Sequence, residues 1–132
     1  MQSDTLTAAA ALRAALERGE HGDALRPYFT DDATVREYPN RIKPAGGSAD
    51  LAALLDESTR GAGLLRSQRY DVVDEFAVGD TAVARLTWTG IVAADLGPFT
   101  AGQELTAHIA QFVRVRDGRV ASIATYDCYE PF

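Results

Sequence analysis

The sequence has few of the residues on which specialised sites depend: one cysteine, two histidines and one methionine among 132 residues. Cys128 has no second cysteine to pair with, so an internal disulfide is impossible and a reducing cytoplasm is the expected location. Two histidines and one cysteine cannot form a usual structural zinc site, and no metal is expected. Basic residues are outnumbered, 13 against 19 acidic ones, and the net charge of −6 argues against nucleic acid or an anionic membrane as a partner.

Long apolar runs and nucleotide-binding motifs are missing as well. No apolar run approaches the roughly 18–20 residues that span a bilayer. The alanine-rich start carries Asp4 and Arg13, whereas a secretory signal has a basic start and an unbroken apolar segment. Arg66 stands where a dinucleotide fingerprint beginning at Gly61 needs its third glycine. The sequence therefore implies no cofactor and no membrane.

What remains is the composition of an ordinary folded domain, with 46% hydrophobic and 24% charged residues. No linker, repeat or low-complexity segment divides the chain, so residues 1–132 are expected to form a single domain. Capping residues and apolar periodicity predict three helices, the first ending at Gly19, the second near 23–29, and the third capped by Ser48 and ending before Gly61. Strands are expected at 33–38, 67–78, 81–93, 103–116 and 119–128.

The strongest local signal is Asp117-Gly118 between two alternating apolar runs, which predicts a long β-hairpin that closes the chain. Helices first and a meander afterwards indicate an α+β fold, with three helices in the N-terminal half packed on one face of a curved antiparallel sheet.

Alternation along the strands predicts which side chains face the helices. Trp88 shares a face with apolar residues and is expected to point inward. Arg114 and Arg116 should point outward, which places Gln111 and Ile109 inward and His108 outward unless a β-bulge reverses the order.

Two carboxylates share parity with core positions: Glu37 with Val35, and Asp127 with Ile123. A buried carboxylate is hydrogen-bonded, raised in pKa, or exposed to a wet cavity. Together with Gln111, these groups favour a pocket over a solid core.

The order of the elements, with VGDTAVARLTWTG and FVRVRDGRV in the meander, resembles the nuclear transport factor 2-like superfamily, and most closely its SnoaL-like group. EYPNRIKPAG and YDCYEP resemble an uncharacterised bacterial sub-group. The resemblance covers nearly the whole chain. It implies a cone-shaped α+β barrel around an apolar cavity, dimeric through the outer sheet face, in a superfamily of isomerases, cyclases, dehydratases, epoxide hydrolases and binding modules. Most of these enzymes use acid/base side chains without a cofactor.

The same resemblance guides the catalytic candidates. Asp127 resembles in placement the late-strand acid of SnoaL-like cyclases and is a candidate general acid/base; alternatively it caps a strand end or pairs with an arginine. Glu37 lies one residue before the position of the ketosteroid isomerase base, and it alternatively forms an ion pair with a nearby arginine or with Lys43. His108 could form a dyad with Asp127, or lie outward in a dimer contact.

Candidate ligand contacts are the inward-facing or aromatic residues near the expected cavity. Each also has a simple packing role, and Cys128 is expected to be a buried, inert thiol. The candidates are Trp88, Gln111, Tyr38, Tyr28, Tyr70, Leu55 and Ile109.

Three functions fit these observations. The first is a cofactor-free isomerase, cyclase or dehydratase acting on a small, apolar, oxygenated molecule. The second is a non-catalytic binding module for an apolar metabolite. The third is an interaction subunit that forms a homodimer through the outer sheet face.

Overall fold

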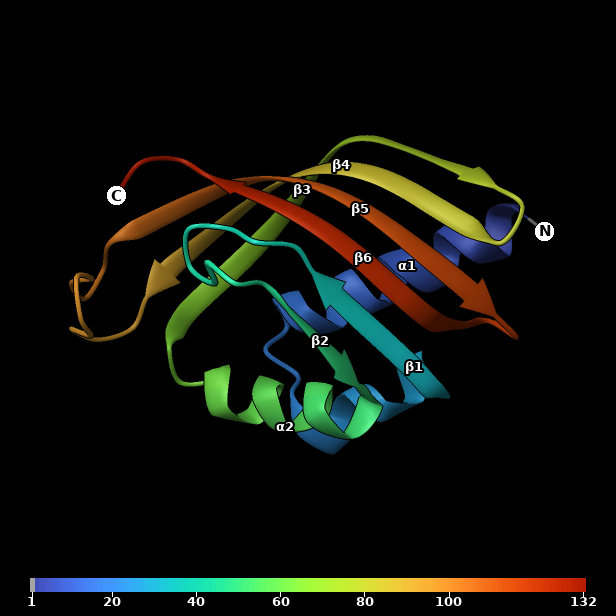
Figure 1. Cartoon of the computed structure of the whole chain (residues 1–132), viewed down its shortest axis with the longest axis horizontal. Helices are drawn as coiled ribbons and strands as arrows, with labels where there is room; N and C mark the ends of the chain where they lie inside the picture. Colours follow the sequence, from blue (N-terminus) through green and yellow to red (C-terminus); the bar gives the residue numbers. More distant parts are fainter. Residues whose placement is uncertain (1) are drawn as a thin grey trace.

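The computed structural model describes residues 2–132, which form two α-helices, one 3₁₀ helix and six strands (Figure 1). The helices are α1 (Gln2–Glu17), η1 (Gly22–Tyr28) and α2 (Leu51–Gly61). The strands are β1 (Phe29–Glu37), β2 (Gly47–Asp50), β3 (Leu65–Val78), β4 (Thr81–Val92), β5 (Glu104–Arg116) and β6 (Arg119–Tyr129).

All six strands belong to one sheet with the order β2-β1-β6-β5-β4-β3. Its neighbouring strands are antiparallel except β1 and β6, which run parallel. The predicted α+β fold with a curved antiparallel sheet is confirmed, apart from this one parallel pair. The parallel pairing joins the first strand of the chain to the last and brings Glu37 next to Thr125 in register.

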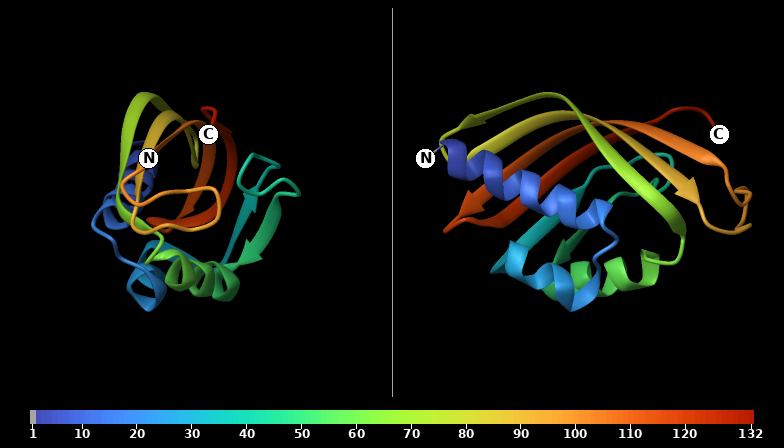
Figure 2. Two further views of the ribbon diagram at one scale, coloured as in Figure 1. Left: turned by 90° about the vertical axis from the view of Figure 1, so that its left-hand side faces the viewer. Right: turned by 180° about the vertical axis from the view of Figure 1, so that it is seen from behind.

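The sheet is long and strongly curved, and it does not close into a barrel (Figure 2). Helix α1 lies along its concave side, where it packs mainly on β3, while α2 packs on η1 and β1 (Figures 1 and 2). We call the face toward α1 the concave face and the opposite one the outer face. Two apolar clusters fill the concave side, one beneath the helices and the other around Trp88.

Local sequence explains the two clearest boundaries. Helix α1 buries Ala8, Leu12 and Ala15 on one side and ends where Gly19 adopts a φ of 84°. The β5–β6 hairpin turns at Asp117 and Gly118, whose φ angles of 53° and 74° match the turn that an Asp-Gly pair favours. Both predictions are confirmed.

The segment between β1 and α2 differs from expectation. The strand β2 was not predicted, and Ser48 lies in it, where its hydroxyl accepts a hydrogen bond from Arg36. The N-cap of α2 is Asp50, whose carboxylate accepts from the backbone N–H of Ala53. Serine and aspartate two residues apart are both good caps, so capping preference alone could not choose between them.

Within the described residues, neither α-helix has the length and continuous apolar sequence that crossing a bilayer requires.

Candidate functional site

The concave face carries a polar group centred on Asp127 of β6. We call Glu37, Tyr70, Thr125, Asp127 and Tyr129 the Asp127 cluster. Asp127 and Thr125 share the inward parity of β6, and the Asp127 carboxylate accepts a hydrogen bond of 2.6 Å from the Thr125 hydroxyl. The backbone of Asp127 lies opposite Ile109, which is 8% exposed, so the carboxylate emerges from an apolar stretch of sheet.

Its surroundings favour the protonated form of Asp127. Burial raises the pKa of this carboxyl, the hydrogen bond from Thr125 acts against that rise, and the negative charge of Glu37 adds to it. Asp127 is half-buried, so the group remains within reach of a ligand. A carboxyl of this kind can give or take a proton closer to neutral pH than an exposed aspartate.

Glu37 occupies the rim of the cluster at the end of β1. Its carboxylate accepts a 2.8 Å hydrogen bond from the Asn40 side chain and lies 3.7 Å from the Lys43 ammonium. The side chain of Glu37 is 27% exposed. The ion pair with Lys43 named as an alternative is thus present, and the charge of Glu37 still acts on Asp127.

Two tyrosines complete the cluster. Burial raises the pKa of Tyr70 to about 12, and the charge of Asp127 acts in the same direction. Burial and the charges of Asp127 and Glu37 also raise the pKa of Tyr129. Both phenols therefore remain protonated at neutral pH and are potential hydrogen-bond donors to a ligand oxygen.

Trp88 forms the apolar wall beside the cluster. It is 9% exposed and meets Tyr129 edge to face, with ring centroids 6.2 Å apart. Its indole N–H donates a 2.9 Å hydrogen bond to the amide oxygen of Gln68, whose own amide donates to the carbonyl of Leu16 at 3.1 Å. Gln68 thereby connects the indole to the end of α1.

Gln111 and Tyr70 face a cavity of about 40 Å³ between α1 and the sheet, also lined by Leu12, Arg13 and Leu16. A cavity of this size holds a water molecule and excludes a metabolite. The prediction that Gln111 points inward is confirmed, because the β4–β5 pairing continues without a bulge from Thr81 to Ile91.

His108 lies on the outer face, away from Asp127. Its Nε2 is 2.9 Å from a carboxylate oxygen of Glu130, and its backbone lies opposite Cys128. The structure therefore does not bring His108 and Asp127 together as a dyad. Cys128 is exposed beside it, which corrects the expectation of a buried thiol.

The remaining candidates are dispersed. Tyr38 stacks on Tyr126 of the outer face, with ring centroids 4.3 Å apart, and does not border the cluster as expected. The Tyr28 hydroxyl accepts from Arg18 and donates to Glu20 near the end of α1. Leu55 is buried in the core cluster beneath the helices.

Gln68, Thr125 and Tyr129 were not predicted as site residues. A usable signal existed, because Gln68 has the parity of Tyr70, and Thr125 and Tyr129 have the parity of Asp127. Extending the alternation along the whole of β3 and β6 would have found all three.

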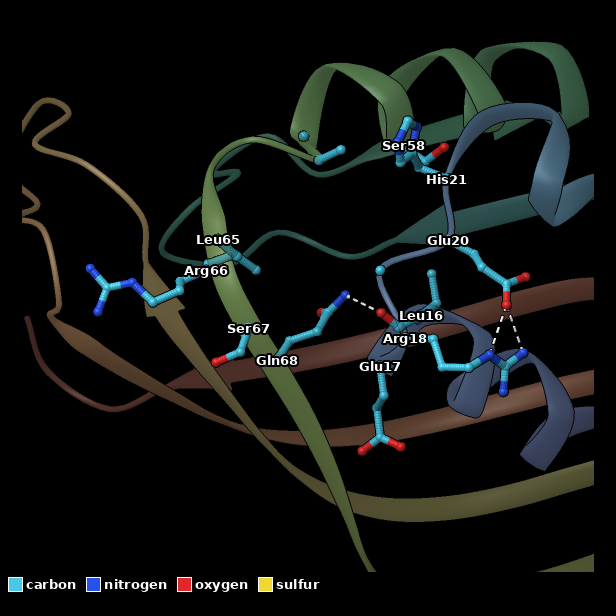
Figure 3. Close-up of a pocket in the computed structure, with 13 residues that line it drawn as sticks. Leu16, Glu17, Arg18, Glu20, His21, Ser58, Leu65, Arg66, Ser67 and Gln68 are labelled. Carbon is cyan, nitrogen blue, oxygen red and sulfur yellow. Dashed lines mark hydrogen bonds and ion pairs between the residues drawn. The ribbon is translucent and has the colours of Figure 1, made fainter.

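Beside this interior, a cleft of about 340 Å³ lies where the ends of α1 and α2 approach the start of β3 (Figure 3). We call it the α1–α2 cleft. Leu16, His21, Ser58, Leu65 and Gln68 are among its lining residues. In residues 2–132, no group of three or more His, Cys, Asp or Glu side chains is arranged to hold a metal ion.

The sequence matches the family model of the SnoaL-like domain over residues 9–123. A search of curated protein sequences found no match.

Solved structures share the fold at low sequence identity. IdmH of Streptomyces antibioticus, a candidate polyketide cyclase, aligns with a TM-score of 0.74 and 22% identity over 93% of this chain and 91% of that one. A protein of Catenulispora acidiphila with a ketosteroid isomerase-like fold, in complex with trimethylamine, aligns with a TM-score of 0.69 and 17% identity. The alignment covers 90% of this chain and 83% of that one. An LEH-like epoxide hydrolase of M. tuberculosis aligns with a TM-score of 0.68 and 17% identity, over 98% of this chain and 84% of that one.

Proposed function

The chain belongs to the SnoaL-like family of the nuclear transport factor 2-like superfamily, and we propose that it is a cofactor-free acid/base enzyme for a small, mostly apolar, oxygenated molecule. The observation that carries the proposal is Asp127, half-buried on the concave face with a pKa raised by burial and by Glu37. Similar folds in a candidate polyketide cyclase and an epoxide hydrolase support small-molecule chemistry on this scaffold.

In the proposed reaction, which is of the isomerase, cyclase or dehydratase type, Asp127 transfers the proton. Tyr70 and Tyr129 donate hydrogen bonds to the substrate oxygen, where negative charge develops. Glu37 holds the pKa of Asp127 up by charge repulsion, and Trp88 and Ile109 supply the apolar wall. Each of these steps uses side chains of this chain alone.

Proton transfer can be tested without knowing the natural substrate. We would follow the exchange of α-hydrogens of 2-tetralone, a flat apolar ketone, for deuterium in D₂O by NMR. The wild-type protein should accelerate this exchange, and Asp127→Asn should lower the rate by about 100-fold or more, the usual contribution of a general acid/base. Glu37→Gln should shift the pH at which the rate is half-maximal.

Asp74→Asn is the matched control, since Asp74 is an exposed carboxylate paired with Arg85 on the outer face. It should leave the exchange rate unchanged. Equal rates for wild type and Asp127→Asn, with both variants folded, would reject the role of Asp127.

A second candidate is a binding module for an apolar metabolite that uses the same face without turnover. The similar fold of the Catenulispora acidiphila protein in complex with trimethylamine supports small-molecule binding on this scaffold. It predicts that 2-tetralone raises the melting temperature of wild type and of Asp127→Asn equally, without deuterium exchange. With either function, we propose that the protein is cytoplasmic and forms a homodimer through the outer face.

A further inference from the structure

The α1–α2 cleft is large enough for a small organic molecule. Its volume of about 340 Å³ is that of a small ligand pocket. Of its charged lining residues, Glu17 accepts a 2.8 Å hydrogen bond from the backbone N–H of Tyr70. Arg18 and Glu20, which also line it, pair with each other at 2.8 Å. Arg66 extends away from the centre, whereas Leu65, Gln68 and Leu16 lie around it (Figure 3).

Two side chains separate this cleft from the concave face. Leu16 lines both the cleft and the 40 Å³ cavity that contains Tyr70 and Gln111. Gln68 lines the cleft, while its amide oxygen holds the indole of Trp88. Both side chains are half-buried, and both can change rotamer without a change in the backbone.

We infer that the α1–α2 cleft is the outer subsite of the ligand site, and that a ligand reaches the Asp127 cluster from it when Leu16 and Gln68 turn aside. The inference rests on the proposed function, because it assumes that a ligand reaches Asp127. It explains why the α1–α2 cleft is open and large, whereas the cavity between α1 and the sheet has room for only a water molecule.

The lining defines the class of molecule admitted. The Ser58 hydroxyl donates to the Leu55 carbonyl and accepts from the Gly22 N–H, so it has little capacity left. The second amide hydrogen of Gln68 and the ring nitrogens of exposed His21 are available instead. The ligand is accordingly a flat, uncharged, mostly apolar molecule with one hydroxyl or carbonyl group.

The test uses 2-naphthol as the probe and the indole N–H of Trp88 as the reporter. Trp88 is the only tryptophan, so its indole N–H gives one signal in a ¹H–¹⁵N spectrum. Titration with 2-naphthol should shift this signal saturably, because Gln68 must move away from the indole.

Gly61 and Gly63 provide a matched pair of variants. A side chain at either position meets nothing within 4 Å, but only Gly61 lines the cleft. Gly61→Phe should fill the cleft and weaken 2-naphthol binding about tenfold or more, whereas Gly63→Phe should change it by less than about twofold. Ala62→Phe, which also fills the cleft, should repeat the effect if Gly61→Phe folds poorly.

The outcomes separate this inference from the proposed function. Equal affinity of wild type, Gly61→Phe and Ala62→Phe would overturn the cleft as the outer subsite, and so would the absence of any shift in the wild type. Neither result bears on the effect of Asp127→Asn on deuterium exchange. Conversely, an unaffected exchange rate in Asp127→Asn would reject the enzyme and leave the cleft result standing.

Discussion

At the scale of single residues, Asp127 has an environment unlike that of an ordinary surface carboxylate. Its pKa is raised from 3.8 by burial and by Glu37, so the folded protein binds this proton more tightly than the unfolded chain does. Stability contributed by this group therefore falls as the pH rises from near 3.8 through the raised folded-state pKa. The burial and the charge repulsion that suit Asp127 to proton transfer therefore also lower the stability of the folded protein at neutral pH.

Asp127→Asn should remove this cost. Its amide oxygen can still accept from Thr125, so the free energy of unfolding relative to wild type should shift in favour of the variant as the pH rises from acid to neutrality. Urea unfolding across this range measures the difference. In a Glu37→Gln background, the stability gained by Asp127→Asn should be smaller. If the difference in the free energy of unfolding between Asp127→Asn and wild type did not vary with pH, the raised pKa of Asp127 would be contradicted.

Gly90 illustrates a second kind of residue-scale constraint. It is buried two residues after Trp88 on the same face of β4, and a Cβ there would lie 2.5 Å from the indole ring. Gly90→Ala should therefore displace the indole and break the hydrogen bond from its N–H to Gln68. We expect this to destabilise the fold by about 1–3 kcal/mol. Thermal unfolding measures the loss, and Gly63→Ala, with open space around it, should be nearly neutral. An unchanged indole signal in Gly90→Ala would show that the ring accommodates the methyl group.

At the scale of elements, α1 is joined to β3 and to the turn that follows it at successive points. The Thr5 hydroxyl donates to the carbonyl of Gly79, Arg13 pairs with Glu75, and the end of the helix meets Gln68. Only the last of these contacts borders the α1–α2 cleft. At the cleft end, α1 is joined to β3 by a second contact as well, a 2.8 Å hydrogen bond from the backbone N–H of Tyr70 to the Glu17 carboxylate.

The Arg13–Glu75 pair is the strongest of these fastenings. Both carboxylate oxygens of Glu75 accept hydrogen bonds from the Arg13 guanidinium, at 2.9 and 3.0 Å. The Arg13 side chain is only 11% exposed and that of Glu75 only 16%. Arg13→Met should leave Glu75 buried without a partner and cost about 3–5 kcal/mol in urea unfolding. The double variant Arg13→Met/Glu75→Leu should recover much of this loss. If it were no more stable than Arg13→Met, an unpaired charge would not be the cause.

At the scale of the whole molecule, local patterns predicted the α+β class, the helices and the inward face of the late strands. They succeeded because β4 and β5 pair without a bulge, so that alternation from Arg114 holds back to His108. They missed the parallel pairing of β1 with β6 and the four-residue β2, since long-range pairing and very short strands leave no periodic signal. Tyr38 was misplaced although alternation from the inward-facing Glu37 assigns it to the outer face, where it stacks on Tyr126.

The site was predictable only in part for a related reason. Asp127, Glu37 and Trp88 could be assigned to one face by parity, because each lies within a strand. The cleft depends on how two helix ends meet β3, and its residues Leu16, Ser58 and Gln68 are far apart in sequence. Their proximity follows from tertiary packing, which single-strand or single-helix patterns do not encode.

The outer face leads to the last prediction, a homodimer. It exposes large apolar side chains across neighbouring strands, including Phe76, which is 54% exposed, Phe112, which is 43% exposed, and Tyr126, which is 41% exposed. A stable interface buries about 1,600 Å² in total, which the broad outer face of a long sheet can supply. We expect sedimentation velocity at micromolar concentration to show a dimer for the wild type and a monomer for Phe112→Asp, because the variant places an unpaired charge at the centre of the patch. Leu96→Asp, at an exposed leucine outside the sheet, is the control and should remain dimeric. A wild-type monomer at this concentration would show instead that the apolar outer face is not an interface between two copies of the chain.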